Sequence, residues 1–193
     1  NYTLNPDTNV VTHADGTEWL QWEVTKGKSI DIARTTFASQ GWMLVSNDQM
    51  AGLFTDFGWG NFLYDNDFSS NVETYTADTD ISTMDMFIEL FGVTYRSCPN
   101  IKSTCFTQAL FGSDLDSDGL YKFTEIISDY AGRRGGVYDD KAYVTPDRYD
   151  RHYILDYGGV ALIRQIVVPE PSSVLIFALG LMGLASRRFM KQA

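Results

Sequence analysis

Residues 9–22 read Asn-Val-Val-Thr-His-Ala-Asp-Gly-Thr-Glu-Trp-Leu-Gln-Trp, and this stretch decides the fold class. β-Branched and aromatic residues lie on both sides of the polar segment Ala14-Asp15-Gly16, a composition typical of a turn between two strands. We therefore expect strands over residues 9–12 and 18–22, joined by this turn.

Three helices are expected further along the chain. Each begins after a side chain that can cap the free backbone N–H groups of the first turn, and each carries apolar residues at helical spacing. The expected caps and helices are Ser29 for residues 30–39, Asn47 for residues 48–56 and Ser82 for residues 82–91. The first helix should stop at Gly41, because glycine readily takes the left-handed conformation that ends a helix.

Short strands make up most of the remaining pattern. They are expected over residues 42–45, 106–111, 120–127, 153–155 and 160–168. The polar, acidic stretch 65–80 is expected to be a surface loop. Short strands mixed with two or three helices predict an α+β domain with antiparallel pairing.

Length and composition narrow the functional classes. The 193 residues favour one domain with an appendage. Twenty-five acidic residues against 15 lysines and arginines give a net charge of −10, which argues against nucleic-acid binding because phosphate recognition needs a concentrated basic surface. An aromatic content of 14% argues against a disordered chain.

The composition changes abruptly at residue 168, which divides the chain into a globular domain, 1–167, and a tail, 168–193. Residues 172–185 read SSVLIFALGLMGLA and carry no charge. This run is shorter than the ~20 residues of a standard membrane span, but with its flanks it could cross a thin bilayer with its basic end in the cytoplasm. A buried core helix is the alternative.

The tail resembles the PEP-CTERM sorting signal. The resemblance rests on Pro169-Glu170-Pro171, the apolar run and the terminal basic pair Arg187-Arg188, in this order. It implies a Gram-negative bacterial export substrate whose tail is recognised by an exosortase, a membrane protease, and processed near Pro-Glu-Pro. The sequence leaves open whether the mature protein keeps the tail.

The same resemblance implies where the protein works. The chain starts at Asn1 without a methionine or a signal peptide, so we expect that an export signal has been removed. The expected location is the cell surface or the extracellular matrix, with a transient or retained inner-membrane anchor. Proteins with this tail often occur in hosts that make exopolysaccharide, which suggests a role in biofilms.

The globular domain has a looser resemblance to the Lcl-type domain of exported bacterial proteins. It rests on residues 15–20 (DGTEWL), Gly41-Trp42, Leu53-Phe54 and residues 160–164 (VALIR). The Lcl-type domain is similar to C-type-lectin-like and formylglycine-generating-enzyme-like folds. This resemblance implies a C-type-lectin-like scaffold for binding or structure rather than an enzyme.

Two cysteines, Cys98 and Cys105, lie seven positions apart. Nearby cysteines in an exported protein usually form a disulfide, and we expect one here. A metal or redox pair is the weaker alternative, because the spacing is wider than Cys-x-x-Cys and no histidine lies nearby.

Residues 114–125 match the pattern of a calcium-binding loop. The carboxylates of Asp114, Asp116 and Asp118 alternate before Gly119, the carbonyl of Leu120 follows, and Glu125 stands at the twelfth position. The residues after Gly119 also have strand character. In a β-hairpin, the aspartates would form only an acidic turn and Glu125 would lie too far along the strand to join them. The sequence leaves both interpretations open.

No catalytic residues are proposed, because the sequence shows no nucleophile motif. Trp22 and Trp59 are candidates to stack on sugar rings, whereas Trp19 and Trp42 are expected in the core. We therefore expect a non-catalytic surface or matrix protein that binds polysaccharide. The alternative is a self-assembling subunit of an extracellular filament or sheath that keeps its apolar helix.

Overall fold

The computed structural model describes residues 1–59, 73–76, 81–95, 104–114, 117–129, 141–145 and 148–165. The helices are η1 (Trp22–Thr25), α1 (Ile30–Phe37), η2 (Ala38–Gln40), α2 (Asn47–Asp56) and α3 (Ile81–Phe91). The strands are β1 (Tyr2–Asn5), β2 (Val10–His13), β3 (Thr17–Leu20), β4 (Met43–Leu44), β5 (Glu73–Thr76), β6 (Thr104–Phe111), β7 (Leu120–Asp129), β8 (Lys141–Val144), β9 (Tyr149–Asp150), β10 (Gly159–Val160) and β11 (Leu162–Gln165).

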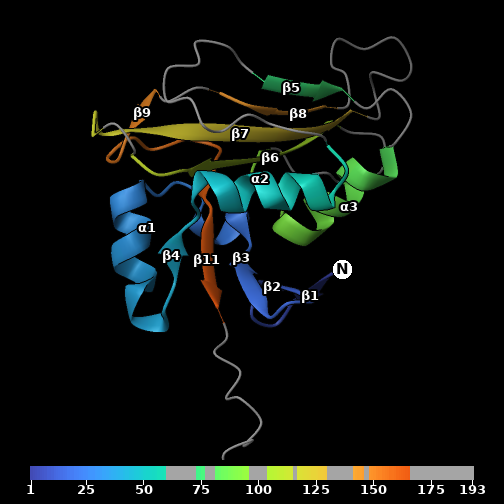
Figure 1. Ribbon diagram of the computed structural model, residues 1–193, viewed down its shortest axis with the longest axis horizontal. Helices are drawn as coiled ribbons and strands as arrows, with labels where there is room; N and C mark the ends of the chain where they lie inside the picture. Colours follow the sequence, from blue (N-terminus) through green and yellow to red (C-terminus); the bar gives the residue numbers. More distant parts are fainter. Residues whose placement is uncertain are drawn as a thin grey trace, which may run out of the picture.

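The strands form two sheets, one above the other in Figure 1. The first has the order β1-β2-β3-β11-β4 and is antiparallel throughout. The second has the order β10-β6-β7-β8-β5, and β9 pairs with β7. In this second sheet β10 runs parallel to β6. The expected α+β class with three helices and short antiparallel strands is confirmed.

The hairpin at the start of the chain is confirmed. Strands β2 and β3 pair in register from Val10 opposite Leu20 to Thr12 opposite Glu18. The Asp15 carboxylate accepts a hydrogen bond from the Thr17 N–H at 2.8 Å, which closes the turn. The expected second strand is shorter than predicted, because Trp22 already belongs to the helical turn η1.

The sequence predicts the N-terminal cap of α1 correctly but not that of α2. The Ser29 hydroxyl accepts from the Ile32 N–H at 3.3 Å, as expected. The predicted cap of α2, Asn47, is wrong. Ser46 has extended backbone geometry and forms a reciprocal capping box with Gln49, in which each side chain accepts from the other residue's N–H. Asn47 therefore starts the helix and is buried.

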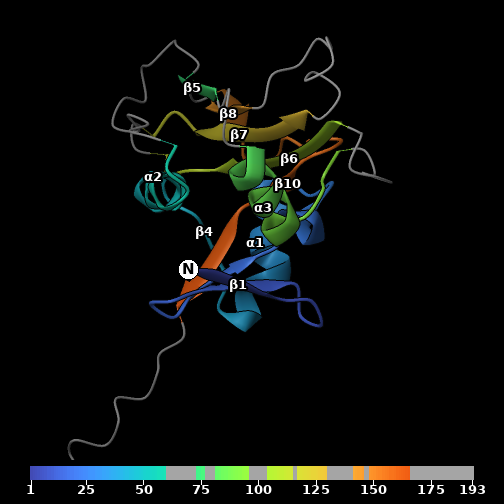
Figure 2. The ribbon, with the colours of Figure 1, turned by 90° about the vertical axis from the view of Figure 1, so that its right-hand side faces the viewer.

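Helices α2 and α3 supply much of a core that also contains residues from both sheets. Their expected apolar faces are confirmed as buried, with Met50, Leu53, Phe54 and Phe57 on α2 and just after it, and Met84, Phe87, Ile88 and Phe91 on α3. Helix α3 begins at Ile81, so Ser82 lies inside it rather than before it. Figure 2 shows α3 end-on between the two sheets. Stacked and edge-on aromatic rings fill this space, with Phe87 and Phe91 only 4.3 Å apart.

The long hairpin β6–β7 is confirmed, with Thr104 opposite Asp129 at one end and Phe111 opposite Lys122 at the other. Two other predictions are wrong. Residues 153–155 form no strand, because the chain turns there with the Tyr153 N–H donating to the Asp150 carbonyl. Residues 73–76, expected in a surface loop, form β5 and pair with β8.

The expected final strand is broken in two at Ala161. Before this residue β10 pairs with β6 in the second sheet, and after it β11 pairs with β3 and β4 in the first. Ala161 itself bonds to both sides, because its N–H donates to the Leu110 carbonyl and its carbonyl accepts from the Val45 N–H. The chain thus crosses between the sheets within a single residue.

Thr25 holds this crossing in place from η1. Its buried hydroxyl accepts from the Val160 N–H at 2.7 Å and lies 2.8 Å and 2.9 Å from the carbonyls of Val160 and Trp22. Gly159 packs so closely that a Cβ there would lie 2.0 Å from the Trp22 carbonyl oxygen. The close packing of β10 against η1 therefore needs both Gly159 and the Thr25 hydroxyl.

The substitution Thr25→Val keeps the shape of the side chain but removes its hydroxyl. We expect it to lower the free energy of unfolding by about 2 kcal/mol, because the buried Val160 N–H loses its acceptor. Thr25→Ser keeps the hydroxyl and should cost only about 1 kcal/mol for the lost methyl. Urea unfolding of both variants measures the difference, and equal losses would contradict the role given to the hydroxyl.

Candidate functional site

Residues from three of the four stretches that carry the resemblance in the globular domain meet at the first sheet, whereas Leu53-Phe54 lies on α2. Arg164 on β11 stands opposite Glu18 on β3 and donates to its carboxylate. The Arg164 guanidinium also lies 4.4 Å from the centre of the Trp42 ring and donates to the Gln40 carbonyl at 3.1 Å. This cluster buries Glu18 and Trp42 and joins the two ends of the domain.

The tryptophans proposed as sugar-stacking residues lie in the core. Trp22 is fully buried, and Trp59 is 3% exposed. Trp22 packs on Phe87 and Phe91, while Trp59 packs on Phe54 and Phe57. The prediction that they present stacking faces is therefore wrong. The sequence around Trp59, rich in glycine, gave no sign that α2 and α3 would enclose it. Trp19 and Trp42 are in the core as expected.

An open groove of about 670 Å³ lies beside α1, and it is the candidate binding site. Helix α1, strand β4, the turn between β6 and β7, and the segment after β9 line it. Its side chains mix charge with apolar surface. They include Asp31 and Arg34 from α1, Met43 from β4, Asp114 from the turn and Arg151 from the segment after β9.

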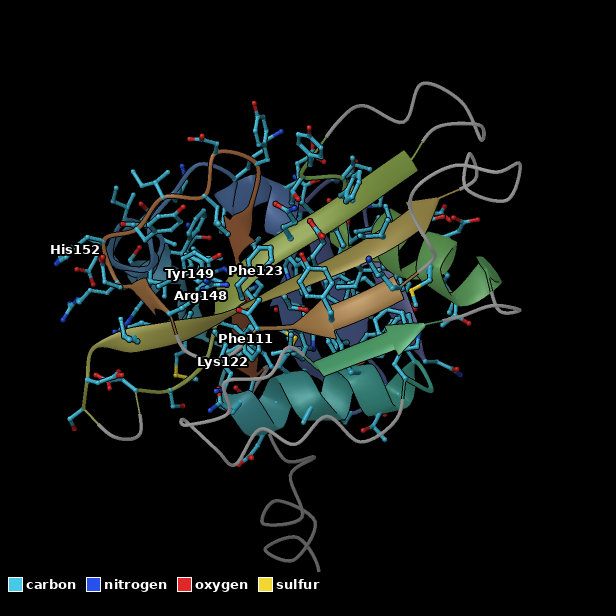
Figure 3. The ribbon with its side chains drawn as sticks, turned by 90° about the horizontal axis from the view of Figure 1, so that it is seen from above. Phe111, Lys122, Phe123, Arg148, Tyr149 and His152 are labelled. Atoms are coloured by element: carbon cyan, nitrogen blue, oxygen red, sulfur yellow. The ribbon has the colours of Figure 1, made fainter. Side chains whose placement is uncertain are left out.

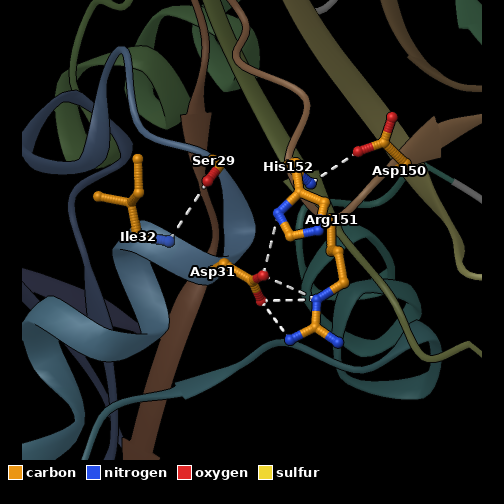
Figure 4. Close-up of polar contacts among 6 residues, drawn as sticks. All are labelled: Ser29, Asp31, Ile32, Asp150, Arg151 and His152. Atoms are coloured by element: carbon orange, nitrogen blue, oxygen red, sulfur yellow. Dashed lines mark hydrogen bonds and ion pairs between the residues drawn. The ribbon is translucent and has the colours of Figure 1, made fainter.

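One wall of the groove is fixed by an ion pair, shown in Figure 4. The Arg151 Nε lies 2.8 Å from both carboxylate oxygens of Asp31, and a second guanidinium nitrogen lies 2.7 Å from one of them. The Asp31 N–H also donates to the Arg151 carbonyl at 3.2 Å, and the His152 ring nitrogen Nδ1 lies 3.2 Å from the carboxylate. The hydrogen bonds from Arg151 lower the pKa of Asp31, so the carboxylate stays charged at neutral pH.

Arg34 differs from Arg151. It lies one helical turn after Asp31, is exposed, and makes no hydrogen bond or salt bridge with the residues that the structure describes. Met43 is 57% exposed at the same groove. An exposed guanidinium, an apolar side chain and a fixed carboxylate can together bind a ligand that has both hydroxyl or acidic groups and apolar faces. Sequence analysis missed these residues, because only the fold brings residues 31–34 and 151 together.

The calcium-loop prediction is not supported at Glu125. This residue lies on β7, in the pair opposite Gln108, and its carboxylate accepts hydrogen bonds from the Gln108 amide and the Tyr143 hydroxyl. Burial and the bond to Glu125 raise the pKa of Tyr143. Because Leu120 to Glu125 is extended strand, it spans roughly 17 Å, which takes Glu125 out of reach of the turn.

The acidic turn is closed by its own side chains. The Asp114 carboxylate accepts from the Gly119 N–H at 3.1 Å, and that of Asp118 from the Leu120 N–H at 2.7 Å. Asp116 lies outside the described residues. Within the described ranges, no three histidine, cysteine or acidic side chains are grouped closely enough to hold a metal ion. Calcium binding by the aspartates stays a prediction.

A second cluster lies on the face of the second sheet that carries Glu125. Figure 3 shows Phe123 and Tyr149 together on neighbouring strands, with Arg148 beside them. The rings of Phe123 and Tyr149 are 5.8 Å apart, and Tyr153 packs on Tyr149 at 4.8 Å. Tyr153 is 44% exposed, so the outer end of this aromatic row reaches the surface.

Two further predictions concern residues that the structure describes only in part. Cys105 lies on β6 and is half-buried, and no cysteine among the described residues is free. Cys98 lies outside the described residues, so the Cys98–Cys105 disulfide stays a prediction.

The predicted sorting residues also lie outside the described residues, and they are Pro169, Glu170, Pro171, Arg187, Arg188 and the apolar run between them. None of the described helices is long and apolar enough to cross a membrane.

Replacement of Glu125 tests whether its role is structural or whether it binds calcium. We expect Glu125→Ala to lower the free energy of unfolding by about 2 kcal/mol, because the Gln108 amide and the Tyr143 hydroxyl lose their acceptor. The loss should be the same in calcium and in a chelator. Denaturant unfolding under both conditions tests this, and a loss confined to the calcium sample would make Glu125 a metal ligand.

Comparison with known proteins identifies one segment of the chain. Residues 167–188 match the PEP-CTERM protein-sorting motif, in agreement with the resemblance of Pro169-Glu170-Pro171 and the segment that follows. No curated protein and no solved structure matches the chain. The chain therefore carries a PEP-CTERM protein-sorting motif, which implies an exosortase substrate that is exported to the cell surface or the extracellular space.

Proposed function

We propose that this protein is a non-catalytic binding protein of the cell surface or extracellular matrix, and that the groove beside α1 binds exopolysaccharide. The observation that carries the proposal is the exposed guanidinium of Arg34, which forms no hydrogen bond or salt bridge within the described residues, in an open groove that also exposes Met43. Export by the PEP-CTERM route brings the groove to the place where such polymers accumulate.

The chemistry of the groove suits a polymeric sugar. Sugar hydroxyls and carboxylates accept hydrogen bonds from a guanidinium, which presents several N–H donors in one plane. The C–H faces of sugar rings can contact Met43. The Asp31–Arg151 pair fixes the wall, so little side-chain freedom is lost there on binding. An open groove accepts an internal segment of a long chain, whereas small molecules are usually enclosed.

The C-type-lectin-like scaffold is part of the proposal. The two stretches that carry the resemblance at either end of the domain pair as β3 and β11. Arg164 on β11 contacts both Glu18 on β3 and Trp42 before β4, and this cluster supports the wall of the groove next to η2. These contacts support a shared scaffold for the two halves of the resemblance.

A self-assembling filament or sheath subunit is the second candidate. It is favoured by residues 172–185, which carry no charge and could pack against copies of themselves if the tail is retained. In that case the same run would serve as an assembly element or a membrane anchor and not only as a sorting signal.

Replacement of Arg34 tests the groove. We expect Arg34→Ala to weaken binding to the host's purified exopolysaccharide about tenfold, the effect of losing one charge-assisted hydrogen-bond donor. The matched control is Lys26→Ala, which removes the same charge from an exposed position outside the groove. Titration calorimetry measures both variants, with thermal melts to check folding. Equal weakening by both variants, or no binding by the unaltered protein, would contradict the proposal.

The intact mass of the protein from its native cells and medium separates the two candidates. We expect the extracellular form to end near residues 169–171, because exosortase processing near Pro-Glu-Pro removes the apolar run. An extracellular form whose mass includes residues 172–193 would instead favour assembly or anchoring through the tail, and electron microscopy of that material would then look for filaments.

A further inference from the structure

The outer strand of the first sheet, β1, has one edge with which no described strand pairs. Among the residues that the structure describes, β1 pairs only with β2, and it ends the strand order of its sheet. Figure 1 shows it at the edge of the sheet, farthest from α1, and Figure 2 shows it running across the lower part of the molecule. An edge of this kind presents backbone donors and acceptors to any strand that can approach it.

The register of β1 shows which groups face outward. The Ala14 N–H donates to the Asn1 carbonyl at 3.1 Å, which makes Tyr2 and His13 a non-hydrogen-bonded pair. Hydrogen bonding alternates along an antiparallel ladder, so Thr3 and Asn5 direct their backbone groups toward β2. The N–H and C=O groups of Tyr2 and Leu4 therefore point away from the sheet.

The side chains of β1 leave this edge accessible and uncharged. Tyr2 and Leu4 are half-buried against the core, while Thr3 and Asn5 are exposed on the opposite face. The strand contains no charged residue and no proline, which are two common means of protecting an edge. Tyr2 is also held firmly, because its hydroxyl donates to Asp56 at 2.7 Å and its ring lies 5.3 Å from that of Phe57.

We propose that a second copy of this chain pairs with β1 in antiparallel fashion, with Thr3 on the two-fold axis. In this register the Tyr2 of each copy lies opposite the Leu4 of the other, and both of their outward backbone groups form hydrogen bonds across the interface. The two first sheets become one continuous sheet. The Tyr2 side chain of each copy then covers the half-buried Leu4 of the other copy.

Two features of this edge favour pairing with a second copy. The outward groups lie symmetrically about Thr3, so the edge is complementary to itself, as a two-fold interface requires. The strand is fixed by Tyr2 and needs no rearrangement before it pairs. The interface uses neither the groove nor the tail, so it stands whether or not the protein binds polysaccharide.

A single cysteine on the axis tests the register. We expect Thr3→Cys to form a reducible dimer under mild oxidation, because Cα atoms in a non-hydrogen-bonded pair lie about 4.5 Å apart, within disulfide range. Asn5→Cys is the matched control, equally exposed on the same face. In the proposed register its two copies lie about 14 Å apart and cannot be bridged. Both variants are made in the full chain and compared in mild detergent.

Charge at the axis gives an independent readout. Thr3→Lys places two like charges directly opposite each other and should weaken the dimer about fivefold in sedimentation velocity, whereas Asn5→Lys should weaken it less. If the chains associated through the apolar tail instead, positions 3 and 5 would give the same result in both experiments. The proposal is overturned if Asn5→Cys crosslinks as readily as Thr3→Cys, or if Thr3→Lys sediments like the unaltered protein.

Discussion

The contact of Thr25 with Val160 is the constraint on which the rest of the domain depends. One buried hydroxyl holds the end of β10 against η1, so the chain must leave the second sheet at Ala161 and enter the first. From there β11 runs between β3 and β4 and closes the five-stranded sheet. Without that insertion, β3 before α1 and β4 after it would have no partner in common, and the first sheet would be divided.

The position of the groove follows from the same crossing. Strand β4 is held on β11, and β11 carries the Arg164 that covers Trp42. On the other side, the segment before β10 is tied to the start of α1 by the pair of Arg151 with Asp31. The walls of the groove are thus parts of the chain far apart in sequence, and polar contacts of Arg164 and of Asp31 fix them. This arrangement holds charged groups in place before any ligand arrives, which reduces the entropy lost on binding.

The sequence predicts the local parts of this fold and misses the parts set by long-range contacts. The hairpin at residues 9–22, the helix after Ser29 and the buried face of α3 follow from turn chemistry, capping and periodicity. The burial of Trp59 and the meeting of Asp31 with Arg151 depend on packing between distant elements, for which one sequence carries no local signal. At Glu125 a short motif competed with strand character, and pairing with β6 and β8 decided the outcome.

The insertion of β11 also determines how the domain responds to mechanical force. The sorting segment follows β11 directly, so a tether in the membrane would pull on this strand along its axis. Because β11 is hydrogen-bonded on both sides, by β3 and by β4, such a pull strains both ladders together in shear instead of opening them one bond at a time. Forced unfolding is governed by the rate of unfolding rather than by equilibrium stability. A domain pulled through its central strand would therefore stay folded longer under force than one pulled through an edge strand.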